Sequence, residues 1–174
     1  MRVIAGEFRS RILKSVPGLA VRPTSDRMRE TLFNVLAPEI PGVTFVDAYA
    51  GTGAVGIEAL SRGASRAVLI EQNRAAIGVI RSNLKSLGIE DRAEVRQGRA
   101  TACLPLVGGH IIFLDPPYDM DREYEAALTI AAGGSARLVI AQHDVRLKLK
   151  DSYGTLQCSR VLKQGDNLLS FFAR

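Results

Sequence analysis

The sequence predicts an α/β protein built on a doubly wound, mostly parallel sheet, and three observations lead to this prediction. An apolar run at residues 43–46 is followed by a glycine loop at residues 51–53 and then by a helix-like run, which is the opening unit of such a sheet. Strand-like and helix-like segments then alternate along the chain. The last two apolar segments are typical of an antiparallel hairpin that turns at residues 163–167. At 174 residues, the chain is expected to form a single domain.

Two elements are expected before the first strand. Residues 2–13 alternate weakly between apolar and polar side chains, so we predict a small N-terminal β-hairpin that lies on the core. A helix should follow, with Thr24 or Ser25 as its N-cap. Apolar side chains at helical spacing predict a core-facing stripe of Met28, Leu32, Val35 and Leu36. The arginines expected to point away from this stripe are Arg22, Arg27 and Arg29.

The remaining elements follow the glycine loop. In chain order we expect a helix at 54–60, a strand at 66–71, a helix capped by Asn73 and stopped by Gly88, a strand at 93–97, a short helix at 101–106, a strand at 111–114, a helix at 121–132, a strand at 138–141 and closing strands at 153–162 and 168–173. Ligands of such sheets bind at the carboxyl ends of the strands. The polar residues at these ends should therefore meet at one rim, and they are Asp47, Glu71, Gly98, Arg99 and Asp115.

The glycine loop carries the first functional motif. Residues 51–56 fit G-x-G-x-x-G, and Glu71 lies about twenty residues on, which is formally the dinucleotide fingerprint. However, Asp47 stands at the strand end, where an acid would repel a pyrophosphate but would suit a ligand with an amine and a positive sulfur. The pattern D-x-x-x-G-x-G resembles the first motif of S-adenosylmethionine-dependent methyltransferases. A nicotinamide oxidoreductase and a purely structural turn are the alternatives.

The second motif follows the strand at 111–114 and reads Asp115-Pro116-Pro117-Tyr118. It resembles the catalytic tetrapeptide of methyltransferases that modify exocyclic amino groups of bases; a proline-stiffened turn is the alternative. The Asp115 side chain and the Pro116 carbonyl can accept the two hydrogens of such an amine, and the prolines fix the backbone that presents them. Tyr118 can stack on a flipped base.

Composition limits the remaining possibilities. Of the net charge of +5, residues 1–30 carry +4, with seven basic against three acidic residues, which is typical of a phosphate-binding footprint. A solvated positive face is the alternative. No apolar run is long enough to span a membrane and no secretory signal is evident, and two isolated cysteines indicate a reducing, cytoplasmic location. Neither the cysteines nor the two histidines have metal-ligand spacing, so no metal site is expected.

Taken together, these segments resemble the bacterial 16S rRNA (guanine-966 N2)-methyltransferases. The resemblance covers nearly the whole chain, including MRVIAGEFRSRILK at 1–14, RPTSDRMRETLFNVL at 22–36, VDAYAGTGAVGIEALSRGA at 46–64, LDPPY at 114–118 and QGDNLLSFF at 164–172. It implies a seven-stranded Rossmann-like methyltransferase fold with S-adenosylmethionine as donor. It further implies a guanine of 16S ribosomal RNA as target, in an assembling small ribosomal subunit.

The resemblance and the motifs together define the expected site. Donor-binding residues are Asp47, Ala48, Gly51, Thr52, Gly53, Glu71, Gln72, Gly98 and Arg99. Catalytic residues are Asp115, Pro116, Pro117 and Tyr118. RNA-contacting residues, most of them in a basic extension at 1–24, are Arg2, Arg9, Arg11, Arg22, Thr24, Arg27 and Arg29. We expect a monomer that binds neither membrane nor metal.

Two positions depart from the family pattern. Arg99 stands where the family commonly has the acid that holds the adenine amino group, which leaves that contact to a neighbouring backbone amide. Gln142 replaces a frequent acid at the end of the strand at 138–141, and a role for that position is in doubt. Because D-P-P-Y serves both kinds of base amine, N6-adenine methylation of DNA or RNA is an alternative function. A non-catalytic RNA-binding assembly factor is another.

Overall fold

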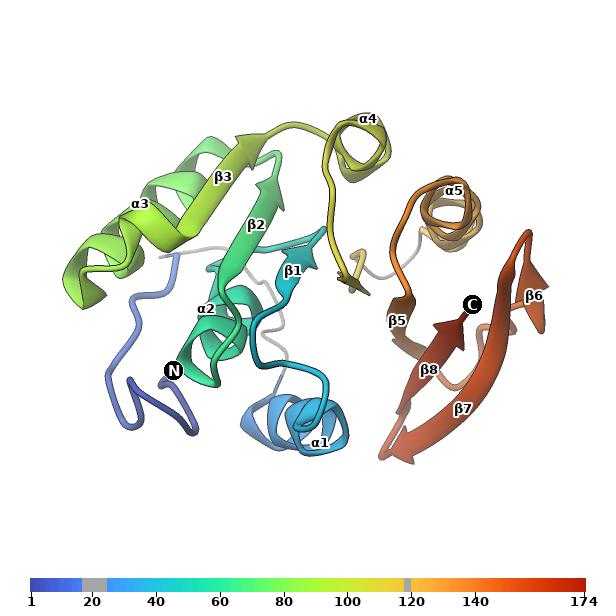
Figure 1. The fold of residues 1–174 in the computed structure, drawn as a ribbon, viewed down its shortest axis with the longest axis horizontal. Helices are drawn as coiled ribbons and strands as arrows, with labels where there is room; N and C mark the ends of the chain where they lie inside the picture. Colours follow the sequence, from blue (N-terminus) through green and yellow to red (C-terminus); the bar gives the residue numbers. More distant parts are fainter. Residues whose placement is uncertain (17–24, 118–119) are drawn as a thin grey trace.

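The sheet contains eight strands in the order β3-β2-β1-β4-β5-β8-β7-β6 (Figure 1). The structure is a computed structural model that describes residues 1–16, 25–117 and 120–174. The strands are β1 (Thr44–Asp47), β2 (Arg66–Glu71), β3 (Ala93–Gln97), β4 (Ile111–Leu114), β5 (Leu138–Asp144), β6 (Ser152–Tyr153), β7 (Leu156–Gln164) and β8 (Asn167–Ala173). The first five are parallel, and β8, β7 and β6 pair antiparallel.

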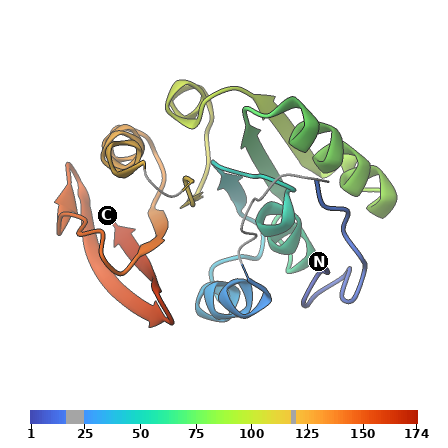
Figure 2. The ribbon, with the colours of Figure 1, turned by 180° about the vertical axis from the view of Figure 1, so that it is seen from behind.

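Helices cover both faces of this sheet (Figures 1 and 2). They are α1 (Asp26–Leu36), α2 (Ala54–Ser61), α3 (Arg74–Leu87), α4 (Ala100–Cys103) and α5 (Asp121–Gly133), with short 3₁₀ turns η1 (Glu90–Arg92) and η2 (Leu104–Leu106). Alternate side chains of one strand enter opposite cores, because Phe45 packs with α1, α2 and α3 while Val46 packs with α4 and α5. The predicted doubly wound α/β fold is confirmed.

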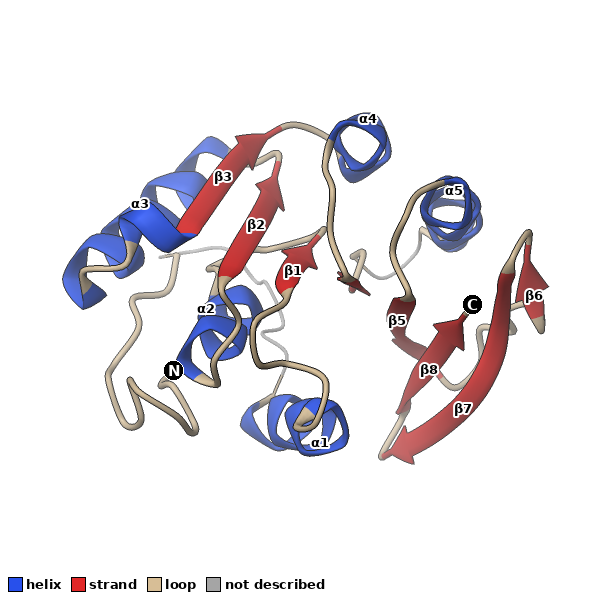
Figure 3. Cartoon of the chain, in the orientation of Figure 1, coloured by secondary structure: helices blue, strands red, loops and turns tan. Residues whose placement is uncertain are grey.

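Local capping explains where two helices begin. Ser25 Oγ accepts a hydrogen bond from the Met28 amide at 3.1 Å, which makes Ser25 the N-cap of α1; Thr24, the other candidate, lies outside the described residues. Asn73 caps α3 through its side-chain oxygen, as predicted, and accepts from the Ala75 and Ala76 amides. Figure 3 shows the resulting alternation of strands and helices from β1 to β5.

The C-terminal strands differ from the prediction by one break. The strand expected at 153–162 is divided by a turn in which Gly154 has φ +55°, a conformation that favours glycine. The two-residue β6 therefore adds an eighth strand to the predicted seven. The hairpin between β7 and β8 turns at residues 165–166, within the predicted turn.

The predicted N-terminal β-hairpin is reduced to a loop that a single antiparallel bridge, Arg2 to Ile12, closes. Three of its apolar side chains belong to the core all the same, because Val3, Phe8 and Leu13 are buried, whereas Ile12 is exposed. These three residues pack into the same cluster as α1, α2 and α3. The prediction that this segment lies on the core is therefore confirmed, whereas the regular hairpin is not.

The N-terminal loop is fastened to α2. The buried Glu58 carboxylate accepts the Ile4 and Ala5 amides at 2.8 and 3.0 Å and pairs with Arg62. At Gly6, which has φ +82°, an added Cβ would lie 1.8 Å from the Ser61 carbonyl oxygen. Only glycine fits this contact, so the path of the loop over α2 is fixed.

None of the helices in the described part of the chain is long and apolar enough to cross a membrane. Within the same residues, no group of three or more histidine, cysteine or acidic side chains could hold a metal ion.

Candidate active site

A pocket of about 820 Å³ opens at the carboxyl ends of the parallel strands. The predicted site residues that line it are Asp47, Ala48, Gly51, Thr52, Glu71, Gln72, Gly98, Arg99, Asp115, Pro116 and Pro117. The structure thus brings residues from the ends of β1, β2, β3 and β4 to one rim, as the strand alternation predicts. The volume lies in the range of small-molecule and cofactor pockets.

The glycine loop has the backbone that a close ligand requires. Gly51 has φ +55°, and Gly53, the N-cap of α2, has φ +80°. A Cβ added at Gly51 would meet no protein atom within 4 Å, so it would occupy space beside the loop in the pocket that Gly51 lines. Gly53 is buried instead, and a Cβ there would lie 3.3 Å from Ile80 Cγ1. The absence of a side chain at Gly51 therefore leaves space in the pocket, and its absence at Gly53 lets the loop pack closely against α3.

Asp47 is a buried acid at the end of β1. Its Oδ2 accepts the Gly56 amide of α2 at 3.1 Å. Burial raises the pKa of Asp47 from 3.8 to about 7, the Gly56 hydrogen bond opposes the shift, and the neighbouring Asp115 and Glu71 charges add to it. A carboxyl group with this pKa is about half ionised at neutral pH, and a cationic ligand would favour its ionised form.

Glu71 connects the glycine loop to α3. Its Oε2 accepts the Gly51 amide at 2.8 Å, and its Oε1 accepts the Asn73 amide at 2.7 Å. Each carboxylate oxygen can accept a further hydrogen bond, so Glu71 can still receive the hydroxyls of a ribose. The residue therefore has a structural role as well as its predicted ligand-binding role.

The D-P-P segment follows β4 directly. Asp115 is partly exposed, Pro116 is buried and Pro117 is exposed, and all three line the pocket. The negative charge of Asp115 contributes to the raised pKa of Asp47, so the two carboxylates interact electrostatically across the site. Tyr118 lies outside the described residues, so its predicted stacking role stays a prediction.

Sequence reasoning missed a cluster of Tyr49, Arg99 and Glu123 in the same pocket. The Tyr49 hydroxyl donates to Glu123 Oε1 at 3.1 Å, and Arg99 Nη2 lies 3.7 Å from Glu123 Oε2. Burial, followed by the Glu123 charge, raises the pKa of Tyr49, so this hydroxyl stays a donor. In sequence, Glu123 is an ordinary acid in a first helical turn, and only the fold shows that it is buried. Gln142 does not line the pocket.

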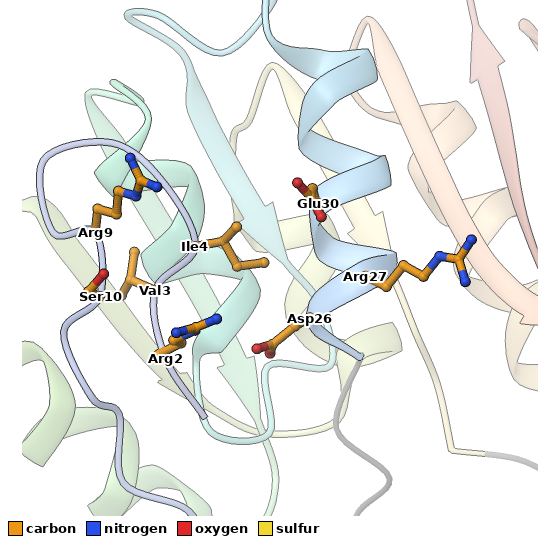
Figure 4. A pocket seen from close by; sticks show the side chains of 8 residues that line it. All are labelled: Arg2, Val3, Ile4, Arg9, Ser10, Asp26, Arg27 and Glu30. Carbon is orange, nitrogen blue, oxygen red and sulfur yellow. The ribbon is translucent and has the colours of Figure 1, made fainter.

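The predicted RNA-contacting residues lie in different environments. Arg2 and Arg9 of the N-terminal loop and Arg27 of α1 line a second pocket of about 580 Å³ together with Asp26 and Glu30 (Figure 4). Arg11 is exposed and donates to the Ser86 carbonyl at 2.9 Å. Arg22 and Thr24 lie outside the described residues.

The expectation for Arg29 is wrong. Its side chain is fully buried rather than directed away from the core, and Nη2 donates to the Arg2 carbonyl at 2.8 Å and to Asp26 Oδ1 at 2.7 Å. A guanidinium held in this way ties α1 to the N-terminal loop and cannot reach RNA. Arg29 shares one helix face with Leu32, Phe33 and Leu36, so helical spacing itself places this side chain on the buried side of α1.

Comparison with known proteins adds an independent finding. A family described as Conserved hypothetical protein 95 matches residues 1–173. "Putative rRNA methyltransferase YlbH" of Bacillus subtilis is 36% identical over 92% of this chain and 91% of that protein. "Ribosomal RNA small subunit methyltransferase D" of Escherichia coli strain K12 is 43% identical over 68% of this chain and 60% of that protein.

Solved structures show the same fold. The "Putative methyltransferase yhhF" of Escherichia coli superposes with a TM-score of 0.87 at 33% identity and covers 100% of this chain and 97% of its own. A hypothetical protein of Thermus thermophilus, TTHA0928, superposes with a TM-score of 0.85 at 29% identity and covers 100% and 99%. The fold of this chain is therefore the α/β methyltransferase fold, with an antiparallel C-terminal addition to a parallel core.

Proposed function

The chain belongs to the family described as Conserved hypothetical protein 95, and from this premise we propose that it transfers a methyl group from S-adenosylmethionine to the N2 amine of a guanine in 16S ribosomal RNA. One observation carries the proposal: the buried acid and glycine loop of β1 and the Asp115-Pro116-Pro117 segment of β4 line the same pocket. The names of the relatives support ribosomal RNA as the substrate class.

The size and charge of the pocket support S-adenosylmethionine as its ligand. Its size suits a nucleoside with an amino-acid arm. Asp47 offers a buried negative charge to a ligand that carries an ammonium and a sulfonium, and Glu71 offers acceptors to a ribose diol. When bound, S-adenosylmethionine supplies a methyl group on positively charged sulfur, which is open to in-line attack by an amine.

The proposed role of the protein is to make that amine a better nucleophile. An exocyclic amine is conjugated with its ring, so its lone pair is a poor nucleophile. Acceptors on both of its hydrogens favour a pyramidal nitrogen, and the Asp115 carboxylate and the Pro116 carbonyl would supply them. Asp115 also receives the proton that the nitrogen must lose. Positioning of this kind can contribute about 7–11 kcal/mol to a rate enhancement.

Donor affinity should depend on the ionisation of Asp47. With a pKa of about 7, Asp47 is about 10% ionised at pH 6 and about 90% at pH 8, so affinity for S-adenosylmethionine should rise by up to about tenfold over this range. The same raised pKa means that the contribution of Asp47 to the free energy of unfolding should fall as the pH rises from about 4 to about 7, because the folded state holds the proton more tightly. Calorimetric titration at each pH measures the first effect and urea unfolding the second. Asp47→Asn should abolish the pH dependence of donor affinity and remove the Asp47 contribution from the pH dependence of unfolding. Two pH profiles that match those of the wild type would contradict the assignment.

The arginines around the second pocket should provide RNA affinity. Arg9→Glu combined with Arg27→Glu should weaken binding of a small-subunit RNA fragment and reduce its salt dependence by about 0.7 in slope for each phosphate that is no longer neutralised. Filter binding across a range of potassium chloride concentrations measures this. Arg160→Glu combined with Lys163→Glu, two exposed changes on β7 that alter the net charge by the same amount, serves as control for net charge. If the control and the test variant show the same reduction in the salt dependence of RNA affinity, the second pocket has no specific role in RNA binding.

The function itself is tested with tritium-labelled S-adenosylmethionine and small ribosomal subunits from cells that lack the modification, followed by nucleoside analysis. Label in N2-methylguanosine would support the proposal in full. Label in N6-methyladenosine would keep the fold and the mechanism but replace the target base. No label, with donor binding intact, would favour the non-catalytic alternative. Free RNA tested in parallel distinguishes a naked substrate from an assembled one.

A further inference from the structure

Among the residues that the structure describes, four carboxylates line the donor pocket, and the proposed function uses three of them. Asp47 bonds the start of α2, Glu71 holds the glycine loop, and Asp115 faces the target amine in the proposed mechanism. The fourth, Glu123 in the first turn of α5, has no role in that mechanism. It is nevertheless only 9% exposed, and a buried carboxylate is costly unless something in the fold or a ligand engages it.

The position of Glu123 indicates which part of the donor it faces. Its partner Arg99 follows β3, and β3 lies next to β2, whose end carries Glu71. The ribose assigned to Glu71 therefore places the adenine on the side of the pocket where Arg99 and Glu123 meet. Ile70, Ala76 and Ala100 line the same pocket and provide apolar contacts suited to a flat base.

An adenine presents an amino group with two hydrogens, and such a group needs an acceptor. Arg99 cannot serve, because a guanidinium has donors only. Glu123 can, because Tyr49 bonds its Oε1 while Arg99 lies 3.7 Å from its Oε2, beyond hydrogen-bond distance. We propose that Glu123 accepts a hydrogen bond from the 6-amino group of the donor's adenine, with Tyr49 and Arg99 orienting its carboxylate. This inference rests on the proposed function, since it assumes S-adenosylmethionine as ligand.

The test compares two ligands that differ at this amine. S-adenosylhomocysteine carries the 6-amino group, and S-inosylhomocysteine carries a 6-oxo group with a protonated ring nitrogen in its place. By calorimetry, the wild type should prefer the adenosyl form. Glu123→Gln should lose about tenfold or more in adenosyl affinity, as expected for a hydrogen bond to a charged group, and should lose most of the preference because an amide can also donate to the 6-oxo group.

Three further variants make the result specific. Glu125→Gln, the same change on the exposed face of α5, should leave both affinities unchanged. Tyr49→Phe keeps the acceptor but removes its anchor, so affinity should fall modestly while the preference remains. Glu123→Asp provides a shortened carboxylate if the glutamine variant does not fold, and it should lose affinity but still prefer the adenosyl form.

Two outcomes would overturn the proposal, and they are distinguishable. A preference that survives intact in a folded Glu123→Gln variant would show that Glu123 only supports the structure and that another group holds the adenine. A wild-type protein that binds neither ligand would remove the donor assignment and, with it, the proposed function. Thermal unfolding of each variant identifies loss of folding as a separate cause.

Discussion

Asp115→Ala is expected to lower methyl transfer by about 10²–10⁴-fold, the contribution typical of a positioned acid–base group, while S-adenosylhomocysteine still binds. The carboxylate would hold one hydrogen of the target amine and accept the proton that the amine loses, and alanine does neither. The change should also strengthen donor binding slightly near neutral pH, because Asp115 is one of the charges that raise the pKa of Asp47. Single-turnover assays measure the transfer step, and calorimetry measures the binding.

Asp91→Ala is the matched control for this experiment. Asp91 is an exposed acid in η1, which precedes β3 and therefore lies at the opposite end of the strands from the pocket. It should keep wild-type turnover. An Asp115→Ala variant that retains turnover within about tenfold would remove Asp115 from the catalytic role.

Gly51→Val is expected to weaken donor binding by about 100-fold or more, which corresponds to about 2.7 kcal/mol. Two physical effects act together. Gly51 has φ +55°, which a β-branched residue adopts only with strain, and its added side chain would project into the pocket rather than against protein. Titration with S-adenosylhomocysteine measures the loss.

Gly42→Val separates these two effects. Gly42 has φ +76° and, like Gly51, would place a Cβ where no protein atom lies within 4 Å, but it precedes β1 and is remote from the pocket. Its substitution should lower the melting temperature through backbone strain and leave donor affinity unchanged. Equal losses of affinity in both variants would mean that strain, and not an encounter with the ligand, explains the effect at Gly51.

The sequence predicted the framework because its signals are local. The apolar run at 66–71, which ends in an acid, and the segment at 93–97 predicted β2 and β3 to the residue, and Asn73 and Gly88 marked both ends of α3. The break at Gly154 was missed because a single glycine within an apolar segment does not reveal its φ angle. The N-terminal loop was mistaken for a regular hairpin because its alternation reflects packing against α2 and not pairing between strands.

The rim of the pocket could be predicted because parallel strands deliver their last residues to one edge. Interactions between side chains on non-adjacent elements could not be predicted from the sequence. Glu123 reaches Tyr49 across 74 positions of the chain, and no spacing rule relates the two. Arg29 was misplaced because its charge was taken to exclude it from the helix face of Leu32 and Phe33; only the structure shows the backbone carbonyl, 27 residues earlier, that pairs with it there.

The attachment of the N-terminal loop to α2 has a consequence for modularity. The segment contributes Val3, Phe8 and Leu13 to the core, and its backbone amides donate to the Glu58 carboxylate. It is therefore part of the fold and cannot be exchanged as a separate module. Deleting residues 1–14 would remove the two amides that Glu58 accepts and would expose apolar surface beside α2, the helix that follows the glycine loop. The segment proposed to bind RNA and the fold that carries the pocket therefore form one structural unit, and changes in RNA affinity are best made at the exposed arginines.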